Sequence, residues 1–200
     1  VGFASRAIQE AFGVHEPMFG HLLDGAMYSD GDRIPRGRYI HPGIEPELAF
    51  IMARPLHGPG ITAAQVLAAT QFVLPAFEIV DVRFPTWKFT AADSIADNGF
   101  NAGAVLAEVG SAAAGVDLRL IGMVMEKNGE VVGTAAGAAV LGHPAGSVAW
   151  LVNKLADTGR RLEPGQIVLA GSFTTTYPVN EGDVLRASYA RLGSISARFT

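Results

Sequence analysis

An apolar run that contains a single carboxylate does most to limit how this chain can fold. Residues 73–80 read Val-Leu-Pro-Ala-Phe-Glu-Ile-Val, and Glu78 is the only polar side chain among them. A run this apolar is typical of a buried strand, and an ionised carboxylate is costly to bury without a partner. We predict a strand over residues 76–84, and we expect the fold to bring a compensating group to Glu78.

A second predicted strand, residues 45–52, carries two more acids. Glu45 and Glu47 share one face, about 6.6 Å apart along the chain, whereas the opposite face is apolar. Spacing alone is compatible with a solvent-facing strand whose acids are harmless. Glu78 favours the other interpretation, in which a cation offsets three clustered carboxylates. Ligands that are all oxygen favour Mg²⁺ or Mn²⁺ over Zn²⁺.

Strand patterns outnumber helix patterns in the rest of the chain. Asn128-Gly129 predicts a tight hairpin between residues 117–126 and 130–134. Capping residues and stops predict three helices, at 6–12 after Ser5, from Thr62 to about Val73, and at 144–158 before Gly159. These patterns predict an α+β fold, and the absence of a linker or repeat predicts a single domain over residues 1–200.

Composition excludes several classes of function. The formal net charge is −4 and there is no basic stripe, which argues against nucleic acid as a partner. The chain has no cysteine, so thiolate metal ligands and disulfides are excluded and a reducing compartment such as the cytoplasm is expected. No apolar run reaches the length of a membrane span, so we expect no membrane partner.

Other sequence signals are weaker. The histidines show no zinc-binding spacing, and there is no Gly-x-Ser-x-Gly elbow or Walker loop. Residues 171–176 read Gly-Ser-Phe-Thr-Thr-Thr and are rich in hydroxyl groups. They indicate either an ordinary polar loop or a loop that binds a carboxylate.

Several motifs together resemble a known family. Residues 44–50 contain a Glu-x-Glu strand, and the other matching runs are residues 75–83, 95–98, 141–144, 166–173 and 192–195. These runs resemble the 2-keto-4-pentenoate hydratase/4-oxalocrotonate decarboxylase family, within the fumarylacetoacetase C-terminal-like superfamily. The resemblance extends over essentially the whole chain, and it is the combination of motifs that makes it specific.

The resemblance implies a fold, a cofactor and a place in metabolism. The implied fold is a mixed, curved β-sheet roll with flanking helices. The implied cofactor is Mg²⁺ or Mn²⁺ on Glu45, Glu47 and Glu78, and the implied role is the breakdown of aromatic rings after meta cleavage. Family members carry a longer N-terminal segment, usually with a Lys just before the position of Val1. We therefore expect residues 1–200 to be a catalytic domain that is truncated at its N-terminus.

The same resemblance implies roles for individual side chains. The residues implied in catalysis are Ser5, Asp24, Gly25, Lys88 and Asp97. Those implied in substrate binding are His143, Ser172 and Thr174. Gly43 and Phe100 depart from the family pattern, which often has Arg at the first position and Ser near the second.

The choice of reaction depends on a few positions. Gly25 stands where hydratases of the family carry an acid, and Trp87-Lys88-Phe89 also resembles the decarboxylases. In contrast, residues 172–174 and 14–17 resemble hydratases of seven-carbon diacids. We predict decarboxylation of 2-oxo-3-hexenedioate (4-oxalocrotonate) to 2-hydroxypenta-2,4-dienoate. The alternatives are a 2-keto-4-pentenoate or 2-oxohept-3-enedioate hydratase, a related C–C hydrolase or isomerase, and a non-catalytic domain.

The resemblance also implies partners. Besides a small 2-oxo acid substrate, we expect a homo-oligomer, with a partner hydratase or decarboxylase as a further component of the assembly.

Overall fold

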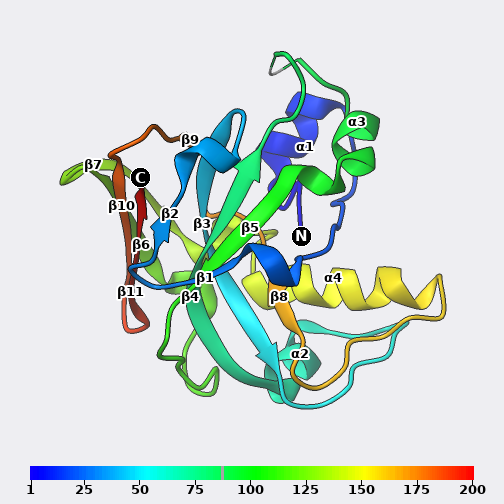
Figure 1. The fold of residues 1–200 in the computed structure, drawn as a ribbon. Coiled ribbons are helices and arrows are strands. Elements are labelled where there is room, and N and C mark those ends of the chain that lie inside the picture. The colour runs from blue at the N-terminus through cyan, green and yellow to red at the C-terminus, as the bar shows by residue number, and fades with distance from the viewer. Residues whose placement is uncertain (87) are drawn as a thin grey trace.

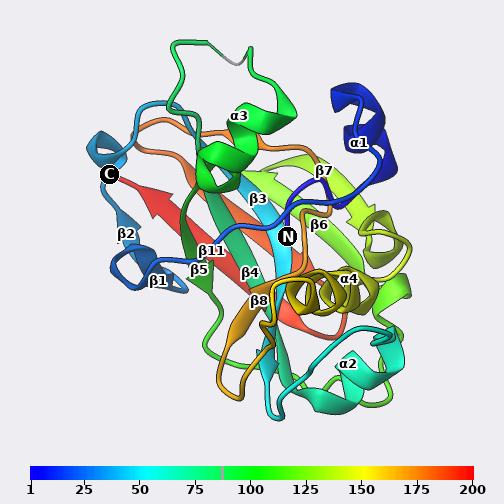
Figure 2. The ribbon, with the colours of Figure 1, turned by 90° about the vertical axis from the view of Figure 1, so that its right-hand side faces the viewer.

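Two mixed β-sheets with a few helices around them form the computed structural model of the chain, which describes residues 1–86 and 88–200 (Figures 1 and 2). Trp87, part of the decarboxylase-like run, lies outside the described residues. The six-stranded sheet has the order β1-β5-β4-β3-β8, with β9 also paired to β3, and the five-stranded sheet has the order β2-β11-β10-β6-β7. The predicted α+β roll with flanking helices is confirmed.

The described residues form eleven strands, four α-helices and five short 3₁₀ helices. The strands are β1 (Met27–Ser29), β2 (Arg33–Ile34), β3 (Pro42–Met52), β4 (Thr70–Asp81), β5 (Asn101–Leu106), β6 (Gly122–Lys127), β7 (Glu130–Ala136), β8 (Ile167–Leu169), β9 (Tyr177–Pro178), β10 (Val184–Tyr189) and β11 (Gly193–Phe199). The α-helices are α1 (Arg6–Phe12), α2 (Ala63–Ala69), α3 (Ala91–Ala96) and α4 (Pro144–Ala156). Short 3₁₀ helices lie at Asp24–Ala26, Arg36–Arg38, Asn98–Phe100, Leu118–Leu120 and Gly137–Ala139.

The β3–β4 pair forms the centre of the larger sheet. Leu48 and Phe50 of β3 and Phe77 of β4 are fully buried in a core shared by both sheets. The observed strand β4 covers Thr70–Asp81. It therefore begins and ends earlier than the strand predicted over residues 76–84. The predicted helix from Thr62 ends at Ala69 and not near Val73. The ladder to β3 takes over at residue 70, and it accommodates Pro75, whose carbonyl accepts a hydrogen bond from the Ala107 N–H.

The hairpin at Asn128-Gly129 is confirmed. Both turn residues have positive φ, 55° and 84°, as a tight turn between two twisted strands requires. The start of the predicted hairpin strand was wrong. Residues 118–120 form a 3₁₀ helix, and the side chain of Asp117 accepts a hydrogen bond from the N–H of Arg119. This local cap competes with strand pairing at the position where β6 was expected to begin.

The helices lie at different ends of the molecule. Helices α1 and α3 are at one end and α2 is at the other, as both views show (Figures 1 and 2). The predicted caps of α1, Ser5 and Gly13, are both present. Helix α4 ends at Ala156, two residues earlier than predicted, and it buries the expected stripe of Val148, Leu151, Val152 and Leu155. No helix within the described residues is long and apolar enough to cross a membrane.

Candidate metal centre

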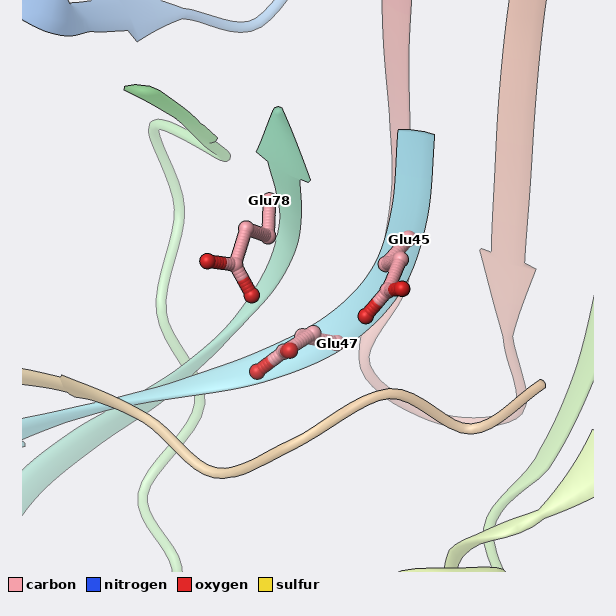
Figure 3. Close-up of side chains that lie close together, drawn as sticks. All are labelled: Glu45, Glu47 and Glu78. Atoms are coloured by element: carbon pink, nitrogen blue, oxygen red, sulfur yellow. The ribbon is translucent and has the colours of Figure 1, made fainter. Parts of the chain in front are cut away.

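Three glutamates converge on one face of the β3–β4 pair (Figure 3). The register pairs Glu45 of β3 directly with Glu78 of β4, and Glu47 lies two residues further along β3 on the same face. One carboxylate oxygen from each residue lies within 4.8 Å of the others. Strand pairing thus brings together three acids that are separated by up to 33 positions in the sequence (78 − 45).

Each carboxylate is held by one uncharged donor. The backbone N–H of Gly171 donates to Glu47 Oε2 at 2.7 Å, and the side-chain amide of Asn101 donates to Glu78 Oε1 at 2.7 Å. The Thr176 hydroxyl donates to Glu45 Oε1. Among the described residues, no Lys or Arg forms an ion pair with these glutamates. The donors orient the carboxylates but do not neutralise them.

The electrostatics of the cluster are unfavourable without a cation. Burial, followed by repulsion from Glu78, raises the pKa of Glu45 to about 7. Burial and repulsion from Glu78 also raise the pKa of Glu47 well above its usual value. Glu47 is fully buried, and its Oε1 atom has no hydrogen-bond partner among the described residues.

The charge and chemistry of the three glutamates decide whether the cluster can hold a divalent cation. A buried carboxylate oxygen without a partner is expensive, and a cation among three carboxylates removes both that cost and the mutual repulsion. The candidate metal ligands are all hard carboxylate oxygens, with neither sulfur nor imidazole among them, and such a set suits Mg²⁺ or Mn²⁺. The residues present therefore fit such an ion.

Two cavities reach the cluster. The first cavity, about 380 Å³, is lined by Glu45 and Glu78 together with apolar and hydroxyl-bearing residues. Its apolar residues include Ile8, Phe12, Val80, Phe89 and Phe100, and its hydroxyl-bearing residues are Ser5, Ser94, Ser172, Thr174, Thr175 and Thr176. No Lys, Arg or His lines this cavity among the residues that the structure describes.

An aromatic series forms much of the apolar wall of the first cavity. Phe12 of α1 stacks on Phe3 at 5.1 Å and on Phe89 at 5.3 Å between ring centroids, and Phe89 meets Phe100 edge to face at 4.4 Å. Helix α1 itself buries no residue. These ring contacts therefore connect α1 to the segment that leads into α3.

The second cavity, about 520 Å³, also reaches Glu78 and is more polar. Asp24, His21 and Asn101 line it, as do Arg160 and Arg161. An anion that approaches the cluster from this side would meet cationic side chains, which the first cavity does not offer.

The structure places the other predicted site residues in different surroundings. Ser5, Ser172 and Thr174 line the first cavity, and Asp24 lines the second. Gly25 is exposed beside Asp24, and a Cβ atom added there would meet none of the described residues within 4 Å. Lys88, Asp97 and His143 line neither cavity. Lys88 is exposed, the Asp97 carboxylate pairs with Arg83 at 2.8 Å, and His143 Nδ1 accepts the Ala145 N–H as the N-cap of α4.

Sequence reasoning missed Asn101, and it only partly anticipated Gly171 and Thr176. Residues 171–176 were expected to be a polar loop or a carboxylate-binding loop. The carboxylates that this loop contacts belong to the protein's own Glu45 and Glu47. The hydroxyl-rich composition of the loop was the available signal, whereas nothing local marks Asn101 as a partner of Glu78.

Comparison with known proteins agrees with this geometry. The family described as "Fumarylacetoacetate (FAA) hydrolase C-terminal" matches residues 4–200. The 4-oxalocrotonate decarboxylase of Pseudomonas sp. (strain CF600) is 45% identical over 203 residues, which cover 100% of this chain and 75% of that protein. The 2-oxo-hept-4-ene-1,7-dioate hydratase of Escherichia coli is 43% identical over 208 residues, which cover 100% of this chain and 77% of that protein.

A solved structure is similar over the whole length of the chain. The 4-oxalocrotonate decarboxylase from Pseudomonas putida G7, complexed with magnesium and adipate, superimposes with a TM-score of 0.96 at 41% identity. The match covers 100% of this chain and 76% of that one.

Proposed function

Because this chain belongs to the fumarylacetoacetate hydrolase C-terminal family, we propose that it is a lyase that depends on Mg²⁺ or Mn²⁺ and acts in the breakdown of aromatic rings after meta cleavage. Its reaction is the decarboxylation of 2-oxo-3-hexenedioate to 2-hydroxypenta-2,4-dienoate. The observation that carries the proposal is a cluster of three carboxylates, two of which, Glu45 and Glu78, line a cavity whose lining is largely apolar.

In this proposal Glu45, Glu47 and Glu78 hold the cation, and their donors keep the carboxylates turned toward it. A bound divalent cation would supply an electrophile for the substrate's 2-oxo acid end. Ser172 and Thr174 line the same cavity and offer hydroxyl groups that can bind the C1 carboxylate.

The apolar wall suits the loss of carbon dioxide. The bond between C5 and C6 breaks and its electrons form C4=C5, while the C3=C4 π pair moves to C2=C3. The C2=O π pair moves to the 2-oxo oxygen, which takes a proton from solvent to give the dienol. An anionic distal carboxylate is poorly solvated beside Phe12, Phe89 and Phe100. Neutral carbon dioxide loses little solvation there, so the apolar surroundings favour the change from carboxylate to carbon dioxide. No basic side chain among the described lining residues stabilises the anion before it leaves.

A hydratase is the alternative function. The same centre would draw electrons toward the 2-oxo group, but water addition also needs a placed acid or base. Asp24 lines the second cavity, which also reaches Glu78, and it is the residue that would serve. A C–C hydrolase or isomerase of the same superfamily is a further alternative, which an assay with an acylpyruvate would detect.

The direct test incubates the full-length protein with Mg²⁺ and 2-oxo-3-hexenedioate while carbon dioxide release is measured. Glu47→Gln is the matched inactive variant, because it keeps the size of the side chain and removes the charge. We expect the unmodified protein to release carbon dioxide and the Glu47→Gln variant to release none. Rapid hydration of 2-hydroxypenta-2,4-dienoate with no carbon dioxide from the diacid would replace this proposal with the hydratase.

Gly25→Asp tests the choice of reaction. A Cβ atom at position 25 has open space around it, so the fold should tolerate the change. An added carboxylate raises the energy of a bound dianion by Coulomb repulsion. Because Gly25 is exposed and lines neither cavity, the repulsion acts at a distance and is screened by solvent, so we expect kcat/KM for decarboxylation to fall about threefold while Mg²⁺ affinity is retained. Unchanged decarboxylation would show that position 25 does not determine the reaction.

We also propose that residues 1–200 form one catalytic domain of a cytoplasmic homo-oligomer. The product 2-hydroxypenta-2,4-dienoate is the substrate of a hydratase, so a complex with such an enzyme would pass the unstable dienol on directly. Light scattering on the full-length protein, alone and mixed with a purified hydratase of this family, measures both associations.

A further inference from the structure

The loop of residues 171–176 holds both acids of β3 from one side. Its first residue, Gly171, donates its N–H to Glu47, and its last residue, Thr176, donates its hydroxyl to Glu45. The chain then enters β9, which pairs with the start of β3 through Gly43 and Pro178. This pairing seats Thr176 against β3 next to Glu45.

Gly43 provides the space in which Thr176 sits. It is buried in β3, two residues before Glu45, and therefore on the face of the strand that carries the acids. A Cβ atom added to Gly43 would overlap with the Cγ2 methyl of Thr176. Gly43 does not have a positive φ, so the backbone conformation alone does not require glycine. The absence of a side chain at position 43 leaves room for the close approach of Thr176.

The methyl and hydroxyl groups of Thr176 cannot move independently. Both are attached to the same Cβ atom, and χ1 has only three staggered positions. Any rotation that moves Cγ2 away from a side chain at position 43 also moves the hydroxyl away from Glu45. A side chain at position 43 would therefore disrupt the hydrogen bond that the Thr176 hydroxyl donates to Glu45.

We propose that Gly43 and Thr176 are a matched pair of positioning residues that sets the orientation of Glu45 for metal binding. The inference rests on the proposed metal site and adds two residues to it that do not contact the ion. Residues that orient ligands typically change metal affinity 10- to 100-fold when they are lost.

The test is a set of four variants, Gly43→Ala, Thr176→Val, Thr176→Ser and the double variant Gly43→Ala/Thr176→Ser. The Mn²⁺ dissociation constant is measured by titration calorimetry on the full-length protein, and the electron paramagnetic resonance spectrum reports the symmetry of the bound ion. Melting temperature in EDTA measures the effect of each change on the metal-free fold.

We expect Gly43→Ala and Thr176→Val each to raise the dissociation constant about tenfold. Thr176→Ser keeps the hydroxyl and should stay within about threefold of the unmodified protein. The double variant should return to the Thr176→Ser value, because serine lacks the methyl that an added Cβ would meet. The next nearest atom, the carbonyl oxygen of Tyr177, is 3.3 Å from that Cβ position, so a methyl fits after a small shift.

Three results separate the explanations. If the double variant binds Mn²⁺ as weakly as Gly43→Ala, or if Gly43→Ala binds normally, the pairing is overturned. If Gly43→Ala fails to fold, Thr176→Val against Thr176→Ser still tests the hydroxyl, and equal affinities of these two would overturn the inference. If the unmodified protein binds no Mn²⁺, the proposed function fails at its metal site, whatever the variants do.

Discussion

At the scale of single residues, the glutamate cluster stores repulsion that a cation would relieve. Glu47 illustrates this, because it is fully buried and one of its oxygens has no hydrogen-bond partner in the part of the chain that the structure describes. We predict that Glu47→Gln abolishes Mn²⁺ binding but raises the stability of the metal-free protein. At pH 8.5, where the glutamate is more fully ionised, the free energy of unfolding should rise by about 1–2 kcal/mol. Each kcal/mol corresponds to about 2–4 °C in melting temperature for a chain of this length. Thermal unfolding in EDTA measures it, and a lower melting temperature than that of the unmodified protein would contradict the prediction.

Asn101 is a second residue whose effect should be local. A register irregularity between β4 and β5 next to Ile79 and Val80 accompanies its placement, and the buried amide reaches Glu78 at 2.7 Å. We predict that Asn101→Ala weakens Mn²⁺ binding about tenfold, because Glu78 loses the donor that orients it.

Asn153 provides the matched control for Asn101. Its side-chain amide accepts a hydrogen bond from the N–H of Ile61 at 2.8 Å and donates one to the carbonyl of Ile61 at 2.9 Å, and it lines neither cavity at the cluster. Asn153→Ala should therefore lower the melting temperature without changing the Mn²⁺ dissociation constant. Calorimetric titration of both variants decides the matter, and equal Mn²⁺ affinity in Asn101→Ala and the unmodified protein would exclude the orienting role.

At the scale of secondary-structure elements, α4 depends on an unusual cap. His143 Nδ1 accepts the N–H of Ala145 at 3.0 Å, which requires a neutral imidazole, and burial lowers the pKa of His143. We predict that His143→Ala destabilises the protein by about 1 kcal/mol, whereas His143→Asn, which retains a capping acceptor, does not.

The same pair of variants tests the role that the family resemblance implied for His143. A capping residue that lines neither cavity should leave KM for the diacid unchanged in both variants. Denaturant unfolding and steady-state kinetics on the same samples separate the two roles. A raised KM in the stable Asn variant would favour substrate binding.

At the scale of the whole molecule, raising the pH should destabilise the metal-free protein and increase the stabilisation that a bound metal ion provides. The pKa of Glu45 is raised to about 7 in the folded chain, above the value near 4.5 of an unperturbed glutamate. Between these values the folded state holds a proton that the unfolded state has lost, so the free energy of unfolding falls as pH rises through this range. We predict that the metal-free protein is more stable at pH 5.5 than at pH 8.

Metal binding requires the ionised carboxylates, so Mg²⁺ affinity should rise over the same pH range. The stabilisation by a saturating ion should therefore be larger at pH 8 than at pH 5.5, following RT ln(1 + [L]/Kd). Melting curves at both pH values, with EDTA and with excess Mg²⁺, measure the two trends together. Glu45→Gln should flatten both, and pH trends that persist in this variant would assign them to other groups.

Much of this protein could be predicted from the sequence because the relevant rules are local. The period-two pattern of β3 puts Glu45 and Glu47 on one face whatever surrounds the strand. Likewise, Ser5 and Gly13 delimit α1, and Asn128-Gly129 closes a hairpin, through interactions that span only a few residues. The presence of Glu78 in an apolar run predicted that something had to compensate its charge.

Contacts between residues far apart in the sequence decided the rest. The register of β3 with β4 places Glu78 opposite Glu45, and a shift of one residue would have turned it to the other face. Asn101, Gly171 and Thr176 reach the glutamates only because separate strands and loops pack at the same point. Helix α2 stops at Ala69, earlier than its own residues suggested, because pairing with β3 takes over at Thr70. Strand periodicity is a local property, and it is enough to predict which acids share a strand face. Which of these acids meet, and which hydrogen-bond donors hold them, depends on register and packing, and these involve the whole chain at once.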